Sequence, residues 1–196
     1  MAFSLTDVAR TAKSELVLIL LGIIAVSLVT FTVYSFTKST PDKNTQRQTN
    51  SVAWNGLSPG ISTKNDVLSN LGSPLEVKTE GNTESLLYSS SNEFRPHELQ
   101  ISQGTTQLIK EQIVNSKAGD LDEFIRKYGR PESIIYGQHG TFAPAHFWGQ
   151  HGLLVFAGTN DGVVIEIWYF PAQTISTFLQ KFPNFTTEPV ERHESY

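Results

Sequence analysis

Residues 63–74 read TKNDVLSNLGSP and residues 120–131 read DLDEFIRKYGRP, and these two stretches decide the fold. Each opens with a residue type that caps helices, Thr63 or Asp120. Each ends in a glycine followed two residues later by a proline, and equivalent positions lie 57 residues apart throughout. Self-similarity at one fixed spacing predicts two copies of a single structural unit.

Both stretches predict a short helix. The side chains of Thr63 and Asp120 can accept hydrogen bonds from unpaired amides of the first helical turn. The same amides give the helix start a partial positive charge, which stabilises nearby carboxylates. We therefore assign Asp120, Asp122 and Glu123 to helix capping rather than to catalysis. The apolar residues form one stripe at helical spacing: Val67, Leu68 and Leu71, then Leu121, Phe124, Ile125 and Tyr128. Gly72 and Gly129 suit the left-handed position that ends a helix.

After each proline the apolar period changes to two, which predicts strands. They fall at 75–79, 84–89, 97–102 and 107–114, then at 132–136, 145–149, 152–157 and 163–170, with a hairpin turn at 160–162. A closing helix is predicted over 171–181, with Pro171 near its start. The fold class is therefore α+β: two helix-plus-antiparallel-meander repeats, about 57–114 and 115–170, forming a helix-on-sheet domain over 54–182.

The first repeat resembles a known family. Gly60, Ile61, Ser62 and Thr63, a valine within the helix and then Leu-Gly-Ser-Pro at 71–74 look like the opening of the BamE-like (SmpA/OmlA) domains. The tandem arrangement resembles the beta-lactamase inhibitor protein fold. The resemblance implies helices packed on an antiparallel sheet, and a role in binding or assembling other envelope proteins rather than catalysis. Residues 115–119, NSKAG, replace the Gly-Ile-Ser-Thr opening in the second repeat.

An uncharged apolar run, LVLILLGIIAVSLVTFTVY, occupies residues 16–34. Its 19 residues would span about 28 Å as a helix, roughly the hydrocarbon core of a bilayer. We predict a single transmembrane helix over 16–36 that contacts the lipid bilayer, after a head at 1–15. A flexible linker over 37–53 and a disordered tail over 183–196 are also predicted. The short head favours an uncleaved signal anchor, which makes the domain extracytoplasmic at the cell membrane.

Composition excludes several classes of function. The 15 Lys and Arg residues and 19 Asp and Glu residues give a net charge of −4, and the basic residues are scattered, which argues against nucleic acid as a partner. The chain has no cysteine, so disulfides, thiolate chemistry and iron–sulfur sites are excluded. No serine-hydrolase elbow, phosphate loop or zinc-protease motif occurs in it. We therefore predict no catalytic residues, no cofactor and no enzyme activity.

Two groups of titratable residues bear on metal and acid–base chemistry. His139, His146 and His151 are a conceivable metal set, although their spacings of seven and five fit no common ligand pattern. Glu166 alternates with Val163, Ile165 and Ile167 along a predicted strand, which places it on a solvated sheet face.

Aromatic residues concentrate in the second repeat. Because strand side chains alternate, Trp168 points to one face of its strand and Tyr169 to the other. One face should contact the helices, and the other either forms an exposed aromatic patch or is covered by helices, tether or a partner. The candidate partner-binding residues are Trp148, Trp168, Tyr169 and Phe147.

The resulting hypothesis is a membrane-anchored, non-enzymatic protein-binding domain of the cell envelope. It would dock another protein through a sheet face or an inter-repeat groove. One alternative is a structural accessory subunit of a larger membrane complex, with Gly22, Ala25 and Ser27 as small residues for helix contacts. A second alternative is a metal or small-ligand sensor that uses the loop histidines.

Overall fold

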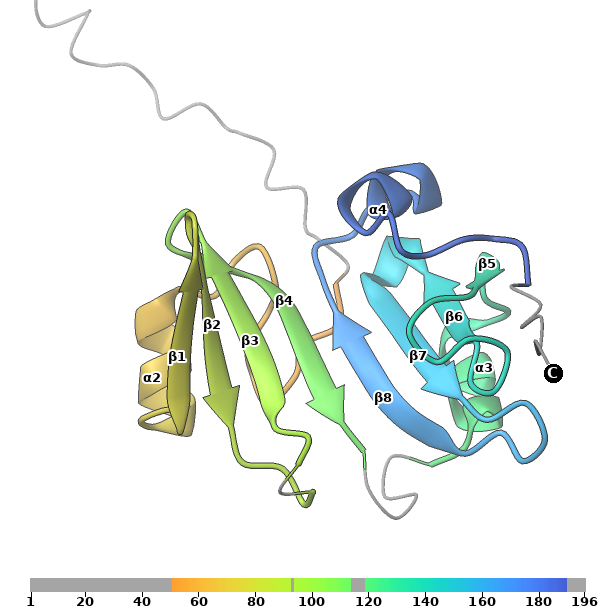
Figure 1. Cartoon of the computed structure of the whole chain (residues 1–196), viewed down its shortest axis with the longest axis horizontal. Coiled ribbons are helices and arrows are strands. Elements are labelled where there is room, and N and C mark those ends of the chain that lie inside the picture. The colour runs from red at the N-terminus through yellow and green to blue at the C-terminus, as the bar shows by residue number, and fades with distance from the viewer. Residues whose placement is uncertain (1–50, 93, 114–118, 190–196) are drawn as a thin grey trace, which may run out of the picture. The chain divides into compact units, whose positions relative to one another are not determined.

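The structure is a computed structural model that describes residues 51–92, 94–113 and 119–189. These residues form one eight-stranded antiparallel sheet with helices packed on it, which confirms the α+β class (Figure 1). Within these ranges no helix is both long and apolar enough to cross a membrane. The predicted anchor over 16–36 lies outside the described residues.

The chain forms two halves, and each consists of a helix followed by a four-stranded meander that supplies half of the sheet. The first half comprises α2 (Lys64–Leu71), β1 (Glu76–Glu80), β2 (Thr83–Tyr88), β3 (His97–Ser102) and β4 (Thr105–Gln112). The second comprises α3 (Leu121–Tyr128), β5 (Ser133–Ile135), β6 (Ala145–Trp148), the 3-10 turn η1 (Gly149–His151), β7 (Leu153–Ala157) and β8 (Val164–Tyr169), followed by α4 (Ile175–Lys181).

The two meanders join at their last strands. The strand order is β1-β2-β3-β4-β8-β7-β6-β5, so β4 and β8 lie side by side at the centre. Ile109 faces Tyr169 and Gln112 faces Glu166 across this antiparallel junction. One continuous sheet therefore carries both repeats, with β1 and β5 as its outermost strands.

The predicted helix signals are present at both repeats. Thr63 Oγ1 accepts from the amide of Asp66 at 3.2 Å, and Asp120 Oδ1 accepts from the amide of Glu123 at 3.1 Å. Gly72 and Gly129 both end their helices with φ 79°, a backbone conformation that favours glycine. Local capping chemistry thus starts and stops the two helices in the same way.

An aromatic side chain secures the end of each helix. The hydroxyl of Tyr88 donates to the carbonyl of Gly72 at 3.1 Å, and Trp148 Nε1 donates to the carbonyl of Gly129 at 2.9 Å. Tyr88 ends β2 and Trp148 ends β6, which are equivalent strands of the two repeats. The helix ends are therefore fixed to the sheet by matched hydrogen bonds.

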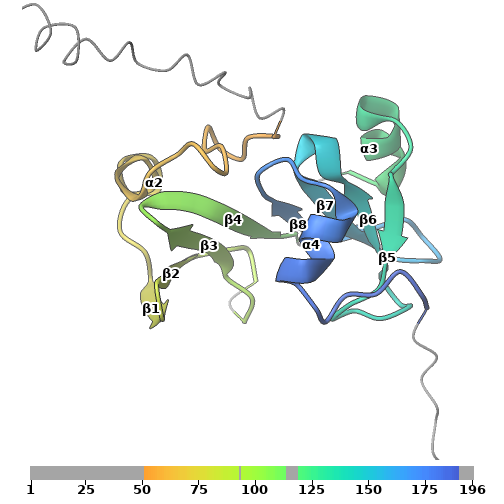
Figure 2. The same cartoon turned by 90° about the horizontal axis from the view of Figure 1, so that it is seen from above.

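The two faces of the sheet are covered differently. Figure 2 shows α2 and α3 on one face and α4 on the other. Beneath α2 and α3 a core that includes Val67, Leu99 and Val155 extends through both halves. Beneath α4 a second core, which includes Phe147, Phe156 and Phe178, belongs almost entirely to the second half. Among the described residues, no helix covers the first half on the α4 side.

Three predicted boundaries are wrong. The closing helix begins at Ile175 rather than 171, because Thr174 caps it by accepting from the amide of Thr177. The linker was expected to reach 53, but the amide of Val52 already donates to the carbonyl of His151 at 2.9 Å. The tail was expected from 183, yet Phe185 is buried and Thr186 pairs with Tyr136. Long-range contacts extend the domain at both ends.

Candidate functional site

The four aromatic residues predicted to contact a partner are buried. Phe147, Trp148, Trp168 and Tyr169 are between 0 and 7% exposed, so they form no surface patch. Phe147 and Trp168 lie in the core beneath α4, and Trp148 and Tyr169 lie in the core beneath α2 and α3. The prediction of an exposed aromatic face at these positions is wrong, because both faces of the second half are covered.

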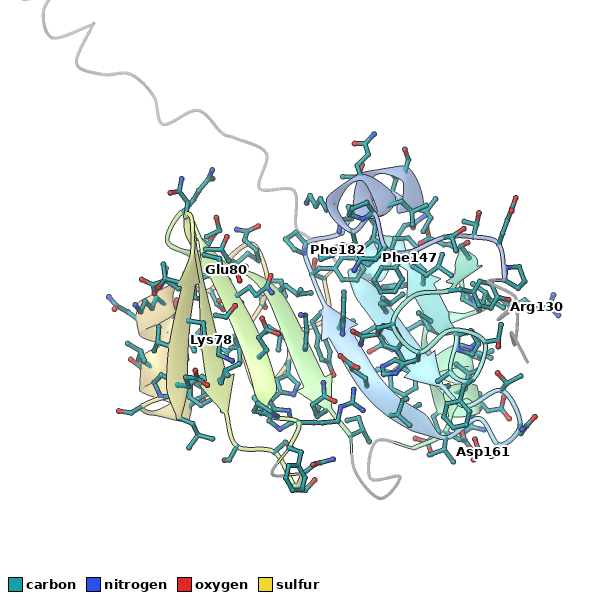
Figure 3. All side chains as sticks on the ribbon, in the orientation of Figure 1. Lys78, Glu80, Arg130, Phe147, Asp161 and Phe182 are labelled. Atoms are coloured by element: carbon teal, nitrogen blue, oxygen red, sulfur yellow. The ribbon has the colours of Figure 1, made fainter. Side chains whose placement is uncertain are left out.

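The contacts of these aromatics explain the aromatic excess of the second repeat. Phe147 stacks on Phe170, with ring centroids 5.8 Å apart, and also packs against Phe178 at 5.3 Å. Trp168 contacts Phe182 edge-on at 5.4 Å. Figure 3 labels Phe147 and Phe182 close to α4, on the opposite half from Lys78 and Glu80 of β1. The aromatics are the packing layer between β6–β8 and α4.

The three candidate metal-binding histidines lie in separate surroundings. His139 contacts Glu166, and His151 packs on the ring of Tyr128 at 5.2 Å. His146 is buried on β6, and this burial lowers the pKa of its imidazole. In the described part of the chain no three metal-ligating side chains come together. The histidine version of the sensor alternative therefore has no ligand set there.

Glu166 is buried at the centre of the sheet, and its predicted position on a solvated face is wrong. Glu166 is only 2% exposed, and its side chain lies on the same face of β8 as that of Trp168. Two loops from different halves of the domain close over its side chain. The alternation of side chains along one strand cannot reveal such a long-range contact. A buried carboxylate needs compensating donors, because transfer of an uncompensated charge out of water is very costly.

Four donors surround this carboxylate. Oε2 accepts from Arg95 Nη2 at 3.0 Å and from Gln138 Nε2 at 2.8 Å, and it lies 2.8 Å from His139 Nε2. Oε1 accepts from Trp168 Nε1 at 2.7 Å. Burial alone would raise the pKa of Glu166, but the hydrogen bonds from His139 and Trp168 and the charges of His139 and Arg95 lower it overall.

The Glu166 centre connects loops that are far apart in the sequence. Arg95 belongs to the loop between β2 and β3, and Gln138 and His139 belong to the loop between β5 and β6. We call residues 89–92 and 94–96, together with 136–144, the paired loops. The contacts of Arg95, Gln138 and His139 with the Glu166 carboxylate tie both of the paired loops to β8.

Each of the paired loops presents an exposed phenylalanine. Phe94 is 92% exposed and Phe142 is 73% exposed. Phe94 is adjacent to Arg95, and Phe142 lies three residues after His139. Sequence reasoning missed Phe94 and Arg95, although one apolar residue in the polar stretch SSSNEFRPHE was a usable signal.

The backbone beside both phenylalanines is held by hydrogen bonds. The amide of Phe94 donates to Asn92 Oδ1 at 3.0 Å, and Ser90 Oγ donates to the carbonyl of Arg95 at 2.7 Å. The amide of Thr159 donates to the carbonyl of Phe142 at 3.1 Å. These bonds fix the loop backbones while the aromatic rings point into solvent, which lowers the ordering cost of a docking contact.

The α4 side of the first half is a second candidate surface, and it is polar. Glu98 accepts from Ser85 at 2.9 Å, from Gln100 at 2.8 Å and from Lys110 at 2.9 Å. Burial tends to raise the pKa of Glu98, but these hydrogen bonds and the charge of Lys110 lower it overall. The charges on this face are thus largely compensated by their neighbours.

Comparisons with known proteins assign no family. No family model matches the sequence, and no curated protein matches it either. Three solved bacterial structures are similar to parts of this chain. A DUF4309 family protein from Bacillus subtilis is 13% identical with a TM-score of 0.44, covering 62% of this chain and 88% of that chain.

The other two solved structures are larger. An extracellular protein containing an SCP domain from Bacillus anthracis is 10% identical with a TM-score of 0.43, covering 72% of this chain and 53% of that chain. A cysteine-rich secretory protein from Staphylococcus aureus is 12% identical with a TM-score of 0.40, covering 70% and 59%. At these TM-scores and identities the likeness shows neither a shared family nor a shared function.

Proposed function

We propose that this protein is a non-enzymatic protein-binding domain of the cell envelope, and that its partner protein docks on the paired loops. The observation that carries the proposal is the pair of exposed phenylalanines, Phe94 and Phe142, on loops whose backbones are hydrogen-bonded. Large aromatic side chains on a pre-ordered backbone are the usual anchors of protein interfaces. The shared Glu166 centre holds both loops to one strand, so a single partner can contact both rings.

The membrane attachment is part of the same proposal. The uncharged apolar run over 16–34 supports a single-pass helix that holds the domain on the extracytoplasmic side. The BamE-like opening motif of the first repeat supports an envelope role of the binding type. Carbonate extraction of membranes followed by protease treatment of intact cells tests both points. Release of the chain by carbonate, or protection of the domain in intact cells, would contradict them.

The docking proposal is tested by site-specific photo-crosslinking in native membranes. A photoreactive residue is placed at Phe94, at Phe142 and, as a control, at Leu75, which is equally apolar and exposed but lies outside the paired loops. We expect the same crosslinked partner from positions 94 and 142 and none from 75. The double variant Phe94→Ala and Phe142→Ala should lose co-purification of that partner while its unfolding temperature stays unchanged.

Two results would overturn the proposal. One is a crosslinking pattern at 94 and 142 that matches the pattern at 75. The other is undiminished recovery of the partner by the double alanine variant. The accessory-subunit alternative stays a prediction, which the particle size after mild detergent extraction would test.

A further inference from the structure

A groove of about 290 Å³ lies beside α4, where the covered half of the sheet meets the uncovered half. The first half contributes Gln100 of β3 and Gln107 and Leu108 of β4 to its lining. The second half contributes the segment after β8 and the end of α4. The groove lies beside α4, which packs on the second half of the sheet (Figure 1).

The lining combines an apolar floor with polar donors. Pro171 and Phe182, which are half-buried, supply the accessible apolar surface, and the buried Leu108 and Phe170 lie beneath it. Gln100, Gln107 and Gln173 supply primary amides, and Lys181 supplies an ammonium group. Of the described side chains that line the groove, none is a carboxylate. Such a lining suits a ligand with an apolar side chain, hydrogen-bonding backbone groups and a negative charge.

The positive charge at the rim is not neutralised by the described carboxylates. Lys181 Nζ donates to the neutral amide oxygen of Gln173 at 2.9 Å, and it takes part in none of the salt bridges between described residues. The nearby anion Glu98 is bound by Lys110 at 2.9 Å. The groove therefore offers one uncompensated cation to a ligand.

We propose that this groove binds a short extended peptide segment of a protein partner that carries an acidic side chain. The acidic side chain pairs with Lys181, an apolar side chain covers Pro171 and Phe182, and the peptide backbone bonds to the amides of Gln100 and Gln107. The volume lies close to the lower end of ligand pockets, about 300 Å³, which limits the contact to a few residues. Extended peptides bound through backbone bonds and one pocket are a recurrent recognition mode.

The groove is separate from the paired loops. Leu108 lies in the first half of β4, and Phe170 directly follows β8, whereas Glu166 faces Gln112 at the opposite end of the same strand pair. The two sites therefore occupy different ends of the central junction. Loss of one site by substitution should leave the other intact, so this inference and the proposed function fail separately.

The test is selection of a random peptide library displayed on phage against the full chain in nanodiscs. We expect enrichment of sequences with Asp or Glu next to an apolar residue. The affinity of a selected synthetic peptide is then measured by fluorescence anisotropy. Lys181→Glu should weaken it at least about tenfold, because like charges then meet in the groove.

Three controls make the outcome decisive. Lys127→Glu makes the same charge change on α3, which lies on the opposite face of the sheet from α4 (Figure 2). This variant should leave the affinity unchanged. A peptide with its acid changed to lysine should bind the Lys181→Glu variant better than the original chain. The double variant Phe94→Ala and Phe142→Ala should bind the peptide normally.

Four outcomes would overturn the inference. The first is a selection that enriches no sequence above the background of the Lys181→Glu variant. The second and third are an equal loss of affinity in Lys127→Glu and a loss of affinity in the Phe94→Ala and Phe142→Ala double variant. The fourth is peptide binding only to a self-associated form of the chain. The last outcome, read by sedimentation, would identify a second copy as the occupant.

Discussion

The two halves of the sheet differ on one face although they share the same elements. Both have a capped helix, a glycine at φ 79° that ends it and a four-stranded meander. Within the described ranges, a helix covers only the second half on the α4 side, and there β6 and β7 are buried along their whole length. In the first half β2 and β3 alternate between buried and half-buried residues, and β1 is exposed throughout. The two halves of one scaffold thus differ in how much of this face is covered.

The open half is protected against uncontrolled pairing. Its outer strand β1 reads EVKTE, and Glu76, Lys78 and Glu80 share the uncovered face. Charged residues on an edge strand discourage addition of a further strand. Antiparallel self-pairing centred on Lys78 would place two lysines opposite each other, which is unfavourable. The available contacts are therefore the sheet face, the groove and the paired loops.

Truncation of the covered face should have the largest effect on stability. Phe147→Ala in the second half should lower the free energy of unfolding by about 3–5 kcal/mol, because a fully buried ring leaves a cavity. Leu87→Ala on the uncovered face of the first half should cost less than about 1 kcal/mol. Urea unfolding of both variants measures the difference. Equal losses would show that the first half is covered as well.

Two carboxylates, the buried Glu166 and the half-buried Glu98, should distinguish the halves next. Glu166→Gln should cost about 2–3 kcal/mol, because it leaves Arg95 and His139 beside a neutral group. Glu98→Gln in the first half should cost about 1 kcal/mol, since solvent screens its partly exposed network. Hydrogen exchange should report faster opening of the paired loops in Glu166→Gln only. Unchanged loop protection would remove Glu166 from its positioning role.

The helix caps should behave alike in the two halves. Thr63→Ala and Asp120→Ala each remove one acceptor for a first-turn amide and should each cost about 1 kcal/mol. The double variant should show the sum, because the two sites are in different repeats. Asp122→Ala, a first-turn acid outside the cap position, should cost only a few tenths of a kcal/mol. Chemical denaturation checks all four, and a large difference between the caps would break the equivalence of the repeats.

The smallest expected effect is the pH dependence due to one histidine in each half, the half-buried His97 and the buried His146. Burial lowers the pKa of His97 in β3, against an opposing effect of Glu111, and burial also lowers the pKa of His146 in β6. The unfolded chain binds these protons first, so stability should fall as the pH drops from about 7 through about 6.5 toward the folded pKa values. His97→Gln and His146→Gln should each flatten this fall, as measured by urea unfolding across that range.

The carboxylates of Glu98 and Glu166 act in a lower pH window. The pKa values of Glu98 and Glu166 are lowered in the folded chain, so their contribution is complete above about pH 4.3 and is lost as the pH falls below that value. For the histidines, a His→Gln variant that still loses as much stability as the original chain between about pH 7 and pH 5.5 would contradict the burial of that imidazole.

Much of the fold was predictable because its signals are local. The caps at Thr63 and Asp120, the glycines that end both helices and the period-two strands all act within a few residues of chain. The eight strands consequently lie close to their expected positions, as for β3 at His97–Ser102. Even the start of α4 was missed by only a few residues, where Thr174 was overlooked as a cap.

The candidate surfaces depended on contacts that no local pattern encodes. Apolar alternation shows that Trp168 and Tyr169 point to opposite faces, but only the placement of α3 and α4 decides that both faces are covered. Glu166 is buried because Arg95, 71 residues earlier, closes over it. Composition and short-range periodicity therefore determined the elements of this protein. Which residues are buried or exposed depends on pairings between distant segments, which exist only after the chain has folded. The paired loops and the groove arise in the same way.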